Sequence, residues 1–148
     1  MIAARRPVLA ALCAFVAAAA VPALAHDGVH IEDPWARFIP GARSGVVYML
    51  IENHAAVEET LLSVSADLAG MASLHTSGKD AKGMTTMDAL PAGLTIAPGA
   101  IAELQIGGTH IMLMDLTRRP KDGESFTLTL TFAHAGKVTV EVPVDNKR

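Results

Sequence analysis

The chain has 148 residues, of which 51% are hydrophobic and 18% charged, and its net charge is −3 at pH 7. This length suits one domain with a core of its own. The acidic balance argues against a nucleic-acid-binding protein, which needs a basic surface. We therefore expect no nucleic acid among its partners.

The first 25 residues have the pattern of a secretory signal peptide. Arg5 and Arg6 precede an alanine-rich apolar run over residues 8–21, and a small-residue cleavage motif ends at Ala25. The run is too short for a comfortable transmembrane helix. We predict cleavage after Ala25, export to the periplasm and one folded domain over residues 26–148, with no stable membrane insertion. The alternative is an uncleaved membrane anchor.

The single cysteine, Cys13, lies inside this leader. The residues before it do not resemble a lipoprotein cleavage box, so we expect no lipid anchor. The exported chain then has neither a disulfide framework nor a thiolate ligand, although it enters a compartment that permits disulfides. A soft-metal site in this chain would have to rely on methionine.

The segment after the leader begins with a polar stretch, residues 26–30, which we expect to be flexible. Its two histidines, His26 and His30, could hold Cu(II) weakly, together with a terminal amine at His26. His54 is expected to be a solvated turn residue. Strands are predicted over residues 31–39, 46–51, 61–64 and 71–76.

A polar turn over residues 77–83 and a returning strand over residues 84–88 predict a β-hairpin. Further strands are predicted over residues 101–106 and 109–116, and clear period-two alternation marks residues 126–132 and 138–144. No run after residue 25 shows helical periodicity. Eight to ten short strands with glycine and proline between them predict an all-β sandwich or barrel.

The predicted strand over residues 109–116 carries an unusual face. Because successive side chains of a strand point to opposite faces, His110, Met112 and Met114 share one face. Thioether sulfur suits Cu(I), and imidazole suits several transition metals. The alternative is a face of ordinary core methionines with one partly buried histidine.

The other soft ligand candidates lie in the predicted hairpin, which can meet this strand at one end of a small sandwich. Two histidines and two methionines would complete a tetrahedral site for Cu(I), with no open position for a substrate. Such a site holds and releases an ion rather than activating a substrate. The candidates are His75, Met84, Met87, His110, Met112 and Met114.

These residues resemble the signature of periplasmic copper chaperones of the PCu(A)C type. In that family a histidine, often followed by methionine, precedes ten residues and a methionine, then a linker of about 21 residues and His-x-Met. Here His75 and Thr76 precede ten residues and Met87, and 22 residues then lead to His110-Ile111-Met112. Thr76 replaces the optional methionine, and the linker is one residue longer. The resemblance extends over residues 30–145.

The resemblance implies a cupredoxin-like Greek-key β-sandwich or barrel that binds one Cu(I) through His75, Met87, His110 and Met112. Met87 is favoured over Met84 because it keeps the ten-residue spacing. Met114 is expected either to lie next to the ligands without binding the ion or to be an ordinary packing residue. Met49 and Met71 are interpreted as core residues.

The family's role, as the resemblance implies it, is to deliver copper in the periplasm for assembly of the copper centre in cytochrome c oxidase. Its partners would be copper-receiving proteins such as oxidase subunit II and Sco-like thioredoxin-fold proteins. We expect a monomer. The alternative is a periplasmic copper storage or detoxification protein that uses the same site.

Three other protein classes fit the residues less well. A blue-copper electron carrier needs a cysteine ligand, which the exported chain lacks. A zinc hydrolase needs three ligands, usually histidine and carboxylate, and an open position, and no other catalytic motif occurs, so we expect no enzyme. A metal-free adhesion module would leave the His-x-Met face unexplained.

Overall fold

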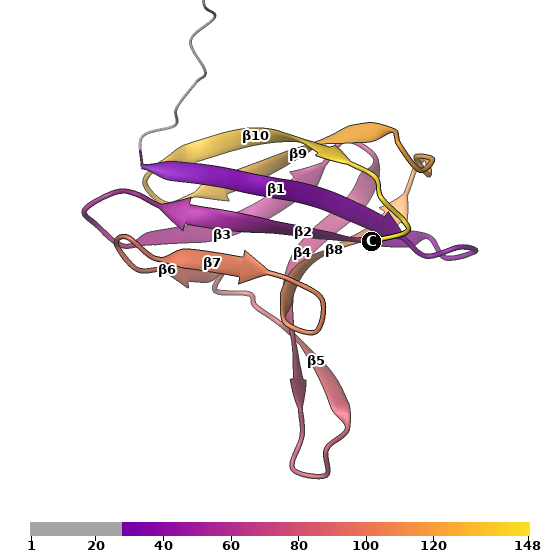
Figure 1. The fold of residues 1–148 in the computed structure, drawn as a ribbon, viewed down its shortest axis with the longest axis horizontal. Helices are drawn as coiled ribbons and strands as arrows, with labels where there is room; N and C mark the ends of the chain where they lie inside the picture. The colour runs from indigo at the N-terminus through magenta and orange to yellow at the C-terminus, as the bar shows by residue number, and fades with distance from the viewer. Residues whose placement is uncertain (1–27) are drawn as a thin grey trace, which may run out of the picture.

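The computed structural model describes residues 28–148, so the predicted signal peptide, its cleavage site and His26 lie outside the described residues. Ten strands form two sheets (Figure 1). In chain order they are β1 (Val29–Phe38), β2 (Ser44–Asn53), β3 (Glu59–Ala66), β4 (Ala69–Lys79), β5 (Thr85–Ala89), β6 (Leu94–Ile96), β7 (Ile101–Leu104), β8 (Thr109–Leu116), β9 (Ser125–Phe132) and β10 (Gly136–Pro143).

The larger sheet has the order β1-β2-β7-β8-β4-β5, with β2 also pairing directly with β8. The smaller sheet has the order β10-β9-β3-β6. This arrangement confirms the predicted all-β, cupredoxin-like sandwich. Among residues 28–148 no helix is long and apolar enough to cross a membrane.

The hydrophobic core lies between the two sheets. The alternating positions of β9 that were predicted to face a core are buried: Phe126, Leu128, Leu130 and Phe132. Side chains of the larger sheet complete it, among them Val47, Met49, Leu74, Ile111 and Leu113. Each such side chain, fully buried, contributes roughly 1.5–3 kcal/mol. The core therefore fixes which face of β4 and β8 points outward.

The β4–β5 hairpin is longer than the sequence predicted and projects away from the body of the sandwich (Figure 1). Residues 77–79, predicted to lie in a turn, pair with β5 instead. The turn itself is held by Asp80, whose side chain accepts hydrogen bonds from the backbone of Lys82 and Met84. The three-residue strand β6 was not predicted, because so short a segment shows no periodicity.

The expectation of a flexible start is wrong for Val29 and His30. Both lie in β1, where Val29 pairs with Asn53 and His30 with Glu52. Backbone hydrogen bonding to β2 orders these residues, a long-range effect that local polarity does not reveal.

A buried carboxylate, Glu59, fastens the β9–β10 turn to the start of β3. The residue is only 3% exposed. Its carboxylate accepts backbone hydrogen bonds from Thr60, His134 and Ala135, at 2.9, 3.0 and 2.9 Å. Burial alone would raise the pKa of Glu59, but these hydrogen bonds favour the ionised form and leave its pKa below the usual 4.5.

We expect Glu59→Gln to destabilise the fold by about 1–3 kcal/mol at pH 7, because an amide replaces an acceptor-only carboxylate facing three N–H groups. Since the folded-state pKa is lowered, this contribution is present above the unfolded-state pKa and is lost as pH falls through the folded-state pKa. Urea unfolding of wild type and variant, at neutral and acidic pH, measures the difference. The exposed neighbour supplies the control, Glu58→Gln. An equal loss in both variants would contradict the role of Glu59.

Candidate metal centre

The two histidines of the predicted site lie directly opposite each other on neighbouring strands. In the antiparallel β4–β8 pair, His75 faces His110. The two rings are stacked, with centroids 6.1 Å apart and planes inclined by 19°. Leu74 and Ile111 beside them are buried in the core, so the histidines occupy the opposite, outer face of the larger sheet. The prediction that the hairpin with His75 meets the strand with His110 is therefore confirmed.

His110 is held in one tautomer by the backbone. Its Nδ1 lies 2.9 Å from the carbonyl oxygen of Gly108. A carbonyl can only accept, so Nδ1 carries the hydrogen and Nε2 keeps its lone pair. A ligating histidine commonly donates its other ring N–H in this way. His110 itself is 4% exposed.

His75 has one ring nitrogen engaged and one unpartnered. Its Nε2 lies 2.9 Å from Oγ of Ser73, two residues earlier on the same face. Its Nδ1 is buried and has no hydrogen-bond partner among the described residues. A buried polar atom without a partner costs about 1–3 kcal/mol, and an ion bound there removes that cost. A ring N–H donated from Nε2 to Ser73 leaves the Nδ1 lone pair for such an ion.

Met112 adjoins the histidine pair on the same outer face. It lies two residues beyond His110 in β8 and directly opposite Ser73 of β4. It is therefore a diagonal neighbour of His75, and residues in such a pair are separated by roughly 7–8 Å. The side chain is half-buried.

Met87 lies on the far side of His75. It is in β5, opposite Ser77, and is likewise a diagonal neighbour of His75, which pairs with Ala89. Its side chain is 53% exposed. The histidine pair thus separates Met87 from Met112 along the strands, so both can bind one ion only if the projecting hairpin bends toward the histidines.

Met84 is placed differently from Met87. It precedes β5, in the hairpin turn, and is 65% exposed. Since residues 85, 87 and 89 share one face of β5, Met87 is the hairpin methionine on the face of His75. The identity of the ligands remains a prediction, but this geometry favours the choice made from spacing.

The remaining methionines divide between core and surface. Met49 is 2% exposed, as expected of a core residue. The same expectation is wrong for Met71, which is 54% exposed. Met71 pairs with Met114 across β4 and β8, and this register turns it to the outer face.

An aromatic row continues from the histidines across the outer face. The Tyr48 ring lies 6.5 Å from that of His110 and 4.5 Å from that of Trp35. Burial raises the pKa of the Tyr48 phenol, and the charge of Arg37 opposes this only partly. Tyr48 therefore adds no negative charge beside the histidines. Arg148 covers the end of the row, 5.1 Å above the Trp35 ring.

The donor set of this face fits a soft monovalent ion. Within residues 28–148, no group of three or more His, Cys, Asp or Glu is arranged to hold a metal. The soft donors beside the histidine pair are thioethers, which favour Cu(I) over harder cations. Sequence reasoning missed Ser73 and the Gly108 carbonyl, although Ser73 shares the strand face of His75 and could have been found from that spacing.

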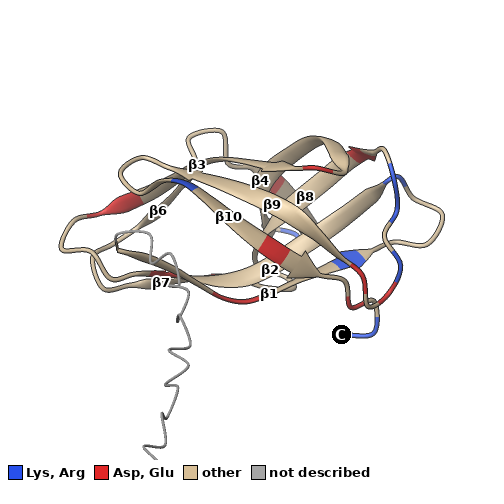
Figure 2. Ribbon diagram, turned by 90° about the horizontal axis from the view of Figure 1, so that it is seen from above, with Lys and Arg blue, Asp and Glu red and all other residues tan. Residues whose placement is uncertain are grey.

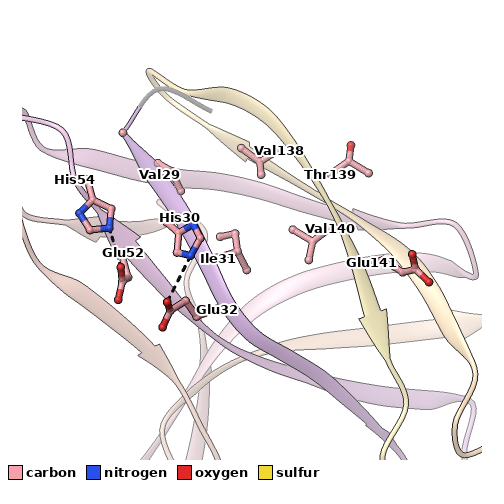
Figure 3. A pocket seen from close by; sticks show the side chains of 11 residues that line it. Val29, His30, Ile31, Glu32, Glu52, His54, Val138, Thr139, Val140 and Glu141 are labelled. Atoms are coloured by element: carbon pink, nitrogen blue, oxygen red, sulfur yellow. Dashed lines mark hydrogen bonds and ion pairs between the residues drawn. The ribbon is translucent and has the colours of Figure 1, made fainter. Parts of the chain in front are cut away.

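A groove of about 970 Å³ lies elsewhere, between β1, β2 and β10, and none of the four predicted ligands lines it. It holds two separate histidine–carboxylate contacts (Figure 3). Nε2 of His30 lies 3.5 Å from Glu32, and Nε2 of His54 lies 2.7 Å from Glu52. The His54 side chain is 64% exposed, as a solvated turn residue would be.

Comparison with known proteins agrees with the fold and with the family resemblance. The LpqE-like family model, described as putative lipoprotein LpqE-like, matches residues 29–144. A putative lipoprotein of Leifsonia xyli subsp. xyli is 28% identical over 130 residues, which cover 86% of this chain and 76% of that protein.

Two solved structures are similar over most of the chain. The apo PCuAC domain from PmoF1 has a TM-score of 0.68 and 25% identity, and covers 80% of this chain and 93% of its own. The solution structure of the Cu(I) form of DR1885 from Deinococcus radiodurans has a TM-score of 0.62 and 28% identity, with 82% of each chain covered. The chain therefore belongs to the LpqE-like family, and the resemblance to PCuAC-type copper chaperones predicted from its sequence is confirmed.

Proposed function

We propose that this protein is a periplasmic copper chaperone. It binds one Cu(I) through His75, His110, Met112 and Met87, and passes the ion on for assembly of the copper centre of cytochrome c oxidase. The observation that carries the proposal is the stacked histidine pair, with an unpartnered Nδ1 on His75 and Met112 adjoining on the same face. The Cu(I) form of the similar protein DR1885 supports the choice of metal.

Binding needs little rearrangement on one side of the site and more on the other. His110 already presents Nε2, because Nδ1 donates to Gly108. Met87 is exposed on the projecting hairpin, so its thioether closes over the ion last and leaves first. An acceptor can then take the ion by replacing Met87 before the histidines release it. No bare ion is set free.

Delivery fits these residues better than catalysis does. Four neutral donors leave no open position at which a substrate could be activated. Imidazole and thioether are both uncharged ligands. The acceptors would be oxidase subunit II and Sco-like copper proteins, which a monomer can approach through the exposed hairpin. Figure 2 shows Asp and Glu interspersed with the Lys and Arg of residues 28–148, which supports a partner other than nucleic acid.

An envelope location follows from the proposed signal peptide. The relatives described as putative lipoproteins support such a location. Storage of copper would use the same site but would retain the ion when an acceptor is offered. A deletion strain with normal respiration and increased copper sensitivity would favour storage over delivery.

We expect His110→Ala or Met112→Ala to weaken Cu(I) binding at least tenfold while the fold is kept, because each removes one donor from the outer face. Competition with a Cu(I) chelator measures the affinity, and circular dichroism checks the fold. His54→Ala is the matched control, an exposed histidine just after the end of β2. Unchanged affinity in both site variants would overturn the assignment.

The two hairpin methionines give a sharper comparison. Met87→Leu should weaken Cu(I) binding and Met84→Leu should not, because only Met87 lies on the face of His75. Leucine keeps the volume and apolar character while it removes the sulfur. X-ray absorption at the copper edge should show one sulfur fewer for Met87→Leu alone. If Met84→Leu weakened Cu(I) binding and Met87→Leu did not, Met84 would be the ligand and the assignment of Met87 would be wrong.

A weak Cu(II) site involving His26 and His30 is proposed separately. Removing residues 26–30 would be a poor test, because Val29 and His30 pair with β2. We expect His26→Ala and His30→Ala, in the exported form, to abolish a Cu(II) electron paramagnetic resonance signal with nitrogen couplings. A signal that persists in the double variant would refute the N-terminal site.

A further inference from the structure

A second group of thioethers lies on the outer face, beyond Met112. Met71 of β4 and Met114 of β8 are directly opposite each other. They occupy the pair next to Ser73 and Met112, which in turn adjoin the histidine pair. Three methionines, Met71, Met112 and Met114, therefore cluster at one place on the sheet.

The spacing of these residues suits a single soft ion. Directly opposed residues have Cβ atoms about 5 Å apart, and the diagonal pair of Met71 and Met112 is separated by roughly 7–8 Å. Met112 and Met114 are about 6.7 Å apart along β8. Each Sδ lies two bonds beyond its Cβ, so three flexible side chains can reach one ion at metal–sulfur distances on the order of 2.3 Å. This triangle is more compact than the spread from Met112 to Met87.

We propose that Met71, Met112 and Met114 form a second Cu(I) site, which serves as the entrance and exit of the histidine site. This inference rests on the proposed function and deepens it. It assigns a role to Met71, which the structure leaves exposed, and to Met114, whose place the sequence left open.

Exposure falls along the line of ligands. Met71 is 54% exposed, Met114 and Met112 are half-buried and His110 is 4% exposed. An ion that arrives at the surface thus meets only thioethers, and it reaches the two imidazoles, of which that of His110 is buried, through Met112, which both sites share. At each step one metal–ligand bond forms as another breaks. The ion stays Cu(I), and no electron or proton is transferred.

The thioether site should be the weaker of the two. Three neutral sulfurs give the ion fewer and less basic donors than two imidazoles with thioethers. The difference gives the transfer its direction during loading. The competing explanation is that Met71 and Met114 merely cover the sheet by packing on each other, in which case the second site does not exist.

The test is a Cu(I) titration of the protein against a chelator, with X-ray absorption at one and at two equivalents. Wild type should take two ions, the first with mixed nitrogen and sulfur scattering. The second, bound by Met71 and Met114 while Met112 holds the first, should add sulfur scattering alone. Met71→Leu combined with Met114→Leu should take only the first. Met84→Leu, an exposed methionine outside both sites, is the matched control and should take two.

A second readout needs no variant. With methionine methyl groups labelled for NMR, Ag(I), a soft ion without redox chemistry here, should shift the Met71 and Met114 signals at the second equivalent and leave the Met84 signal in place. One ion bound by wild type, or a second ion retained by the double variant, overturns the inference. Failure of the proposed function is distinct: the first ion would then lack nitrogen scattering.

Discussion

The pairing of β4 with β8 is the constraint on which the rest of the site depends. Because side chains alternate between faces, a slip of one residue would bury His75 and expose Leu74. The core prevents this slip, since Leu74, Ile111 and Leu113 are each no more than 5% exposed between the sheets. The outer face that carries the proposed ligands is thus specified by apolar contacts on the other side of the same strands, and the histidines need no partner of their own to hold the register.

One carbonyl connects this pairing to the chemistry of the site. Gly108 accepts a hydrogen bond from the backbone of Ser77 at 3.1 Å and another from Nδ1 of His110 at 2.9 Å. A carbonyl oxygen has two lone pairs and can accept both. The preceding Gly107 has φ +80°, a conformation that glycine adopts without strain, and this places the carbonyl at the turn. The Gly-Gly turn therefore fixes both the root of the hairpin and the tautomer of the imidazole.

The sequence predicted what depends on local alternation and missed what depends on long-range pairing. Alternation with a period of two residues predicted the strands around Phe126 and Val138. It also predicted that His110 and Met112 share one face. Met71 was wrongly predicted to be a core residue. The face of a strand to which an apolar side chain points is not determined until its partner, here Met114, is known. Likewise the pairing of His30 with Glu52 gives a strand where polarity indicated a tail. Ligand spacing selected Met87, yet no spacing could show that the hairpin carries it away from the sandwich.

The placement of soft ligands at the surface also explains why the site avoids charge. A thioether never ionises, and in the proposed site each of the two imidazoles has one nitrogen in a hydrogen bond, which leaves the other nitrogen for the ion. A carboxylate or thiolate in their place would bind harder cations or form disulfides in an oxidising compartment. In the proposed site, neutral donors would bind Cu(I) through their lone pairs, without the attraction of a negatively charged ligand, so that one sulfur can be replaced at a time. An ion held in this way is selected by its softness and is still free to leave by ligand exchange, and both properties come from the same choice of methionine.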